Sequence, residues 1–131
     1  MKKIGTLNQG LSEVLAGMGH YDMLVIADAG LPIPPGVRRI DLALTTGVPG
    51  FVQTLAVILS ELQVESAVIA GEMETCSPAL RERIGGLLTG IPVDTVSHEE
   101  LKKLTRQAVA VVRTGEFTPY ANIILKSGVV F

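Results

Sequence analysis

Apolar positions along the chain follow two different periods. Between residues 8 and 18 they recur three and four positions apart, which predicts an amphipathic helix that ends at Gly19. At 23–27 the apolar residues form a continuous run of strand length, and the mostly apolar segment 64–70 is predicted to be the next buried strand. The pattern therefore predicts helices alternating with buried strands.

The rest of the chain continues this alternation. Further strands are expected at about 40–44, 93–96 and 108–112, and two short apolar runs at 123–125 and 129–131 follow. Further helices are expected over about 51–62, after Ser77-Pro78 and after Ser97. We therefore expect residues 1–131 to form a single three-layer α/β/α domain with a mostly parallel central sheet, in which the last two runs could form an antiparallel edge.

Composition narrows the class of protein. Apolar residues make up 47% of the chain but aromatic residues only 4%, so the core is expected to consist of aliphatic side chains. The net charge is −2 and the basic residues are scattered, which disfavours nucleic acid and anionic lipid as partners. A mean hydropathy of +0.43 favours burial of apolar surface between subunits, so we expect a homo-oligomer.

Location is inferred from the absence of export signals. No apolar run reaches the length of a signal-peptide core or a membrane span. Cys76 is the only cysteine, which excludes an internal disulfide and fits a reducing compartment. These features predict a cytoplasmic protein.

Two polar residues flank the run at 23–27. His20 comes after the first helix, where it could act as an acid or base, or simply interact with the last carbonyl groups of the helix. Asp28 ends the run, at the edge of a parallel sheet where ligands bind, although an aspartate before Ala-Gly is equally typical of an Asx turn. Both interpretations stay open for each residue.

The second histidine lies at the start of a predicted helix. Ser97 and Glu100 have the spacing of a capping box, so His98 is expected in the first turn, where a histidine is usually solvated. A zinc site built from His20, His98 and a carboxylate is a weak alternative, because no HExxH motif or comparable spacing is present. No nucleotide-binding glycine motif occurs either, so no metal and no organic cofactor is expected.

The segment 113–122 is polar and directly follows a predicted strand. If it is extended, Tyr120 and Asn122 point the same way and could bind one ligand. Arg113 and Glu116 could instead form a structural ion pair.

Four segments together resemble the D-ribose pyranase family, along essentially the whole chain. They are residues 15–20 (LAGMGH), 25–34 (VIADAGLPIP), 97–100 (SHEE) and 113–122 (RTGEFTPYAN). Ile4 and Gln9 stand where relatives often carry His and Ser, but no functional role depends on them.

The resemblance implies a cofactor-free isomerase that interconverts the pyranose and furanose forms of D-ribose. It implies that His20 is the proton donor and that the sugar is bound by Asp28, His98, Tyr120, the backbone of Ala121, and Asn122. It also implies ring-shaped homo-oligomers, typically decamers, with sites at the subunit boundaries.

Three rival functions remain. Fucose mutarotases are similar around His20 and Tyr120 to Asn122, but usually carry a bulkier residue where this chain has Gly30. A non-catalytic sugar-binding or transport-associated protein would need Asp28, Tyr120 and Asn122, but no titrating histidine. A purely structural assembly protein would explain the apolar excess, but not the polar residues at strand ends.

Overall fold

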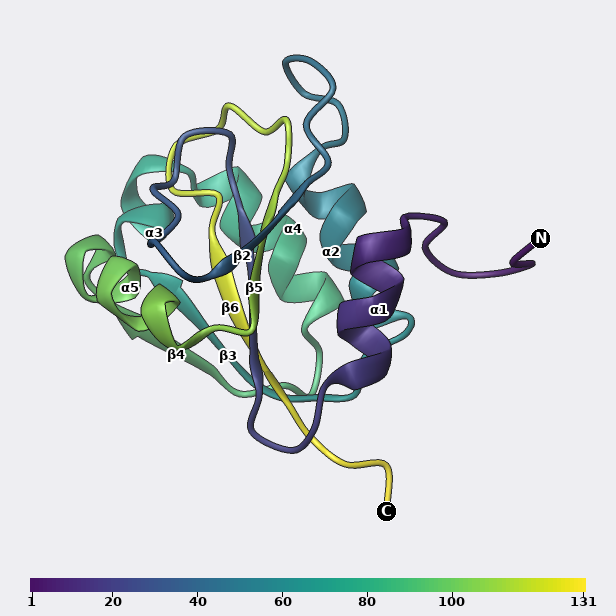
Figure 1. Ribbon diagram of the computed structural model, residues 1–131. Coiled ribbons are helices and arrows are strands. Elements are labelled where there is room, and N and C mark those ends of the chain that lie inside the picture. Colours follow the sequence, from purple (N-terminus) through teal and green to yellow (C-terminus); the bar gives the residue numbers. More distant parts are fainter.

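A six-stranded sheet with helices on both faces forms the centre of the computed structural model, which describes residues 1–131 (Figure 1). Its strands are β1 (Met23–Ala27), β2 (Arg38–Asp41), β3 (Val64–Ala70), β4 (Val93–Val96), β5 (Ala110–Arg113) and β6 (Ile123–Ser127). The helices are α1 (Gln9–Gly17), α2 (Phe51–Leu59), α3 (Glu72–Cys76), α4 (Pro78–Leu87) and α5 (His98–Leu104), followed by the 3₁₀ turn η1 (Thr105–Gln107). The predicted α/β class is confirmed.

The strand order is β2-β5-β1-β6-β3-β4. Strands β2, β5 and β1 are parallel to one another, as are β3 and β4, whereas β6 runs antiparallel to both of its neighbours, β1 and β3. The expected antiparallel edge is therefore wrong in position: β6 lies inside the sheet, and residues 129–131 form no strand. An interior place suits Ile123, Ile124 and Leu125, which are all fully buried.

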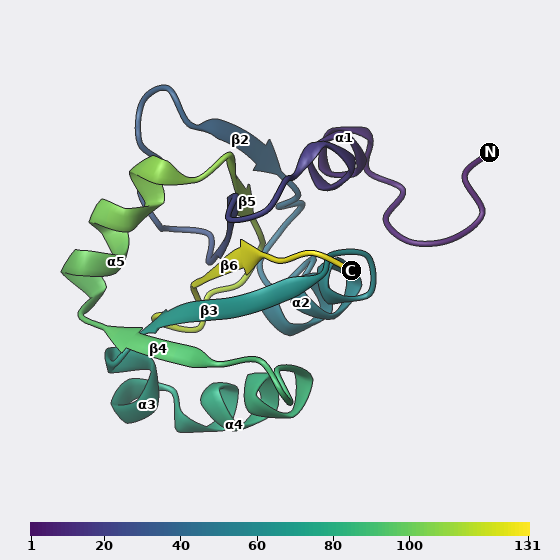
Figure 2. The same ribbon diagram turned by 90° about the horizontal axis from the view of Figure 1, so that it is seen from below.

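The two faces of the sheet carry separate apolar clusters. The larger one joins α1, α2 and α4 to one face, with Phe51, Leu55 and Ile84 completely buried. The smaller one joins Leu101 of α5 and Leu31 of the proline-rich loop to the other face. Figure 2 shows α5 on the side of the sheet opposite α2 and α4, so the three-layer arrangement follows from these two clusters.

Local signals account for several helix starts. The side chain of Asn8 accepts a hydrogen bond from the Leu11 N–H (2.8 Å), and Ser97 accepts one from the Glu100 N–H (3.1 Å), as in a capping box. Ser77 occupies the cap position of α4, but its hydroxyl donates to the Pro119 carbonyl instead (2.8 Å). Ser77 thus attaches the start of α4 to the polar segment 113–122.

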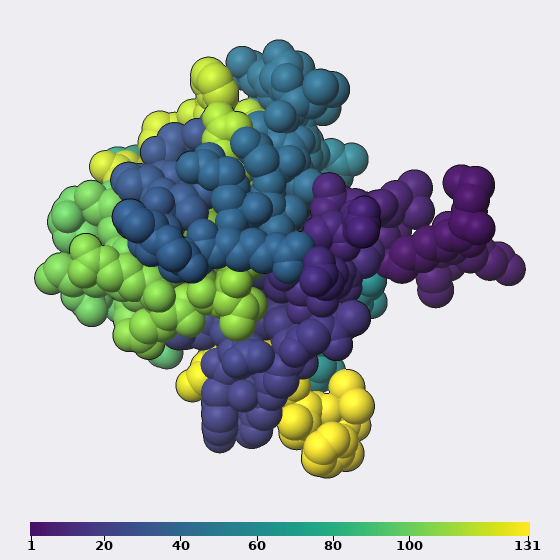
Figure 3. All heavy atoms as spheres, in the orientation of Figure 1, coloured from purple at the N-terminus to yellow at the C-terminus, as the bar shows by residue number.

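Both chain ends extend away from the body of the molecule (Figures 1 and 3). The C-terminal tail is apolar yet exposed, since Val130 and Phe131 retain 84% and 101% of their accessible surface. None of the helices combines the length and the apolar character that crossing a membrane requires.

The close approach of Gly115 to a neighbouring loop gives a stability prediction. A Cβ added there would lie 2.6 Å from the Val48 carbonyl oxygen and 2.7 Å from the Val48 nitrogen. Gly115→Ala should therefore lower the free energy of unfolding, by about 1 to 3 kcal/mol. Urea denaturation at one fixed protein concentration measures the change.

Gly86 is the matched control, because a Cβ on this exposed position of α4 would meet nothing within 4 Å. Gly86→Ala should raise the free energy of unfolding by about 0.5 to 1 kcal/mol. Equal effects of the two substitutions would contradict the described packing of Gly115.

Candidate functional site

Asp28 and Asn122 form a hydrogen-bonded pair at one end of the sheet. Asp28 follows β1 and Asn122 precedes the antiparallel β6, so the two meet at the same edge. The Asn122 side chain is fully buried; its amide NH₂ donates to the Asp28 carboxylate (3.0 Å) and its oxygen accepts from the Asp28 N–H (2.9 Å). Asp28 also accepts from the Gly30 N–H (2.9 Å), so the Asx turn is present as well. The structural and functional interpretations of Asp28 are therefore compatible.

Tyr120 and His98 form a second pair. Their rings meet edge to face with centroids 5.1 Å apart. Tyr120 has a φ of 62°, so the segment turns at this residue and the condition of an extended segment is not met. Tyr120 consequently contacts His98, while Asn122 contacts Asp28, and the buried Ala121 lies between them.

The Nδ1 atom of His98 is buried and has no hydrogen-bond partner within the chain. The backbone N–H of His98 donates to the Glu72 carboxylate (2.7 Å), and this hydrogen bond holds the first turn of α5 against α3. A buried ring nitrogen without a partner is a candidate for a hydrogen bond with a ligand hydroxyl.

A hollow of about 390 Å³ opens beside Asp28. It is lined by Asp28, Ala29, Gly30, Arg113, Glu116, Phe117, Thr118 and Pro119. This volume falls within the range of small-molecule sites.

Arg113 supports the wall of this hollow. Its Nε donates to the Ala29 carbonyl (3.0 Å), and its Nη1 donates to both oxygens of Asp41 (3.1 and 3.2 Å). Burial raises the pKa of Asp41, but the Ala43 N–H and the Arg113 guanidinium together outweigh it and lower that pKa below its ordinary value. The alternative of an ion pair between Arg113 and Glu116 is not formed, since Arg113 pairs with Asp41 and Glu116 accepts from the Thr118 hydroxyl (2.9 Å).

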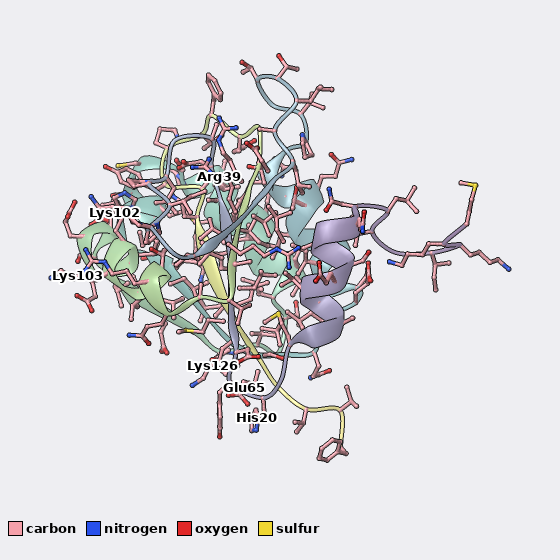
Figure 4. All side chains as sticks on the ribbon, viewed as in Figure 1. His20, Arg39, Glu65, Lys102, Lys103 and Lys126 are labelled. Carbon is pink, nitrogen blue, oxygen red and sulfur yellow. The ribbon has the colours of Figure 1, made fainter.

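His20 lies at the opposite end of β1. The five residues of that strand alone separate it from Asp28 by about 16 Å. Its Nε2 is 2.9 Å from a carboxylate oxygen of Glu65, and its ring stacks on Tyr21 with centroids 3.7 Å apart. Figure 4 shows His20 beside Glu65 and Lys126, far from Lys102 on α5.

One copy of the chain thus brings four of the five candidate side chains to the same end of the sheet as two pairs, Asp28 with Asn122 and His98 with Tyr120, and leaves His20 at the other end. The zinc alternative is not assembled within one copy, because His20 and His98 lie at opposite ends of the sheet, and no three His, Cys, Asp or Glu side chains gather.

Sequence patterns gave no role to Glu65 or Glu72, which contact His20 and His98. The available signal was the place of each carboxylate: Glu65 lies inside the mostly apolar segment 64–71, and Glu72 directly follows it.

Comparison with known proteins gives full-length matches. The model of the RbsD / FucU transport protein family matches residues 1–130. A D-ribose pyranase of Symbiobacterium thermophilum is 62% identical over 131 residues, which are the whole of both chains.

Two solved structures are also similar to this chain over all or nearly all of its length. RbsD of Bacillus subtilis, complexed with D-ribose, superposes with a TM-score of 0.97 at 49% identity and full coverage of both chains. The fucose mutarotase of Streptococcus pneumoniae, in complex with L-fucose, superposes with a TM-score of 0.83 at 26% identity and 95% coverage of each chain.

The Asp28–Asn122 pair gives a second stability prediction. Asn122→Asp replaces the donor with a buried carboxylate that faces Asp28, so the free energy of unfolding should fall by about 2 to 4 kcal/mol at pH 7. A proton shared between the two carboxylates relieves the repulsion, so the folded variant binds it more tightly than the unfolded chain does. The loss in free energy of unfolding should therefore grow as the pH rises from about 4 to 7. Denaturation at several pH values measures it.

Asn8→Asp is the control, since a carboxylate at the cap of α1 can still accept from the Leu11 N–H. A deficit at Asn122→Asp that did not change with pH would contradict the like-charge explanation.

Proposed function

The chain belongs to the RbsD / FucU transport protein family, and from this membership we propose that it acts as a D-ribose pyranase, an isomerase that interconverts the pyranose and furanose forms of D-ribose. The observation that carries the proposal is the likeness, over the whole chain, to a protein of that name and to a relative complexed with D-ribose.

The reaction moves protons and one ring bond. The bond between the anomeric carbon and the ring oxygen breaks, and its electron pair stays on the oxygen, which takes a proton from an acid. The anomeric hydroxyl gives its proton to a base and becomes the aldehyde oxygen. Another hydroxyl then closes the ring by the reverse steps. No electron leaves the sugar and no group is transferred, so the proposal assigns neither metal nor organic cofactor.

The proposed roles follow the chemistry of each side chain. His20 donates the proton to the ring oxygen, as an imidazole can near neutral pH. Asp28 and Asn122 bind sugar hydroxyls, supported by their fixed mutual orientation. His98, Tyr120 and the Ala121 backbone complete the binding edge, and the free Nδ1 of His98 makes it the candidate base.

These roles require two copies of the chain at each site. His20 and Asp28 lie at opposite ends of β1, so the His20 end of one copy must face the Asp28 end of another. Exposed apolar side chains at both ends, such as Tyr21 and Phe117, support such contacts. A repeated end-to-end contact closes into a ring when the rotation between neighbouring copies allows it. We propose a ring-shaped homo-oligomer, and the resemblance to the D-ribose pyranases makes a decamer the proposed size.

We also propose a domain organisation, a location and a set of partners for the protein. The full-length family match and the one continuous sheet support residues 1–131 as a single D-ribose pyranase-like domain. The net charge of −2 and the single cysteine support a cytoplasmic protein that serves ribose utilisation, without a nucleic-acid or membrane partner.

A second candidate, sugar binding without catalysis, is favoured by the word "transport" in the family's description. Mutarotation of another sugar such as fucose is supported less, because the fucose relative shares only 26% identity.

Ring exchange of D-ribose is the direct test. NMR saturation transfer should reveal faster pyranose–furanose exchange with catalytic amounts of protein, and the acceleration should survive a chelator. His20→Ala should reduce the catalysed rate by about 10²- to 10⁴-fold with the fold intact. Exchange at the buffer rate with ribose still bound would favour the sugar-binding candidate instead.

The two-copy site is tested by complementation. His20→Ala and Asp28→Asn should each be inactive alone. Co-expressed with different tags and purified through both, they should recover activity, because in equal mixtures about a quarter of the interfaces pair an intact His20 with an intact Asp28. Mixed assemblies as inactive as their parents would show that each copy holds its own site.

A further inference from the structure

Glu65 is the only carboxylate that contacts the His20 ring, with its Oε2 2.9 Å from the ring Nε2. The two side chains come from residues 45 positions apart and are both partly exposed, at 38% and 34%. An exposed ion pair contributes little to stability in general, so the contact calls for a reason other than folding energy.

A β-bulge presents Glu65 to His20. In the pairing of β3 with β6, Val64 lies opposite Ser127 and Ser66 lies opposite Lys126, which leaves Glu65 as the extra residue. A bulge interrupts the regular alternation and redirects the side chain of the inserted residue. The regular pleat of β3 alone would not set the direction of this carboxylate.

Gly128 makes room for the bulge. A Cβ on Gly128 would lie 3.0 Å from the Glu65 Cβ, and the Gly128 N–H donates to the Gln63 carbonyl (2.9 Å). The end of β6 thus holds the backbone on both sides of Glu65.

The other side of the imidazole is fixed by Tyr21. The rings stack at an interplanar angle of 19°, and Tyr21 has a φ of 71°, a conformation that L residues seldom adopt. The Tyr21 N–H donates to the Ser127 carbonyl (2.9 Å), and the Lys126 ammonium lies 4.6 Å from the centre of the Tyr21 ring. His20 is therefore held by a stacked ring and by a carboxylate at one nitrogen.

We propose that Glu65 is a positioning residue that accepts the Nε2–H of His20, so that Nδ1 is the nitrogen that exchanges a proton with the sugar. This inference rests on the proposed function only for the identity of the proton acceptor. Protonated His20 carries hydrogens on both nitrogens. When the ring C–O bond breaks, the Nδ1 proton passes to the sugar oxygen, and neutral His20 keeps the Nε2–H that Glu65 holds. Reclosure returns a proton to Nδ1.

The tautomer of His20 tests the proposal without any activity measurement. The chain has only two histidines, so protein labelled with ¹⁵N in the histidine rings gives four ring signals. Solid-state NMR on the sedimented protein, at a pH where the imidazole is neutral, separates protonated from bare nitrogens, and His98→Gln assigns the signals. We expect the Nε2–H form of His20 in the wild-type protein and a mixture of both forms in Glu65→Ala. Glu65→Gln keeps an acceptor oxygen and should keep the Nε2–H form.

The rate of ribose exchange is the second readout. Glu65→Ala should lower the rate at saturating ribose by about 10- to 100-fold while ribose affinity stays unchanged, because Glu65 acts through His20. Glu65→Gln should recover part of this loss. Glu82→Ala removes an exposed carboxylate of α4 and should match the wild-type protein in both readouts.

Two results would overturn the proposal: an Nδ1–H tautomer in the wild-type protein, or a tautomer and rate unchanged by Glu65→Ala. Failure of the proposed function gives a different result: the wild-type protein would then not accelerate ribose exchange, whatever the tautomer of His20.

Discussion

The antiparallel direction of β6 determines what lies at each end of the sheet. β6 runs antiparallel to β1. Asn122, the residue directly before β6, therefore meets Asp28 just beyond the end of β1. The other end of β6, at Ser127 and Gly128, meets the turn before β1 and the bulge at the start of β3. A parallel strand in the same place would bring neither set of groups together. Backbone pairing on both sides of β6 therefore fixes the sugar-binding edge and the surroundings of His20 at once.

Much of this fold was predictable because its signals are local. The bounds of β1, β3 and β4 match the predicted strands, which are short segments rich in apolar and β-branched residues. The capping pattern at Ser97 likewise located the start of α5. The interior place of β6 was not predictable, because strand order depends on pairing between distant segments. The five-residue α3 was missed because it is too short to show a period.

The candidate site was predictable in its members but not in its geometry. Asp28 stood out at the end of an apolar run, whereas the full set of sugar-binding residues came from the resemblance to a family. The separation of His20 from Asp28 could have been inferred, since a whole strand lies between them. The contact between His20 and Glu65 could not have been inferred, because it depends on a β-bulge that no local sequence pattern predicts.

The fixed length of β6 has a consequence for how chains of this kind can diverge. Loops at the surface tolerate insertions and deletions, since their ends can shift at little cost. In β6 a single inserted or deleted residue would turn every following side chain to the opposite face of the sheet. It would also displace either Asn122 or Gly128 from its contact. The spacing between these two residues should therefore be free of alignment gaps, even among relatives whose loops have changed length.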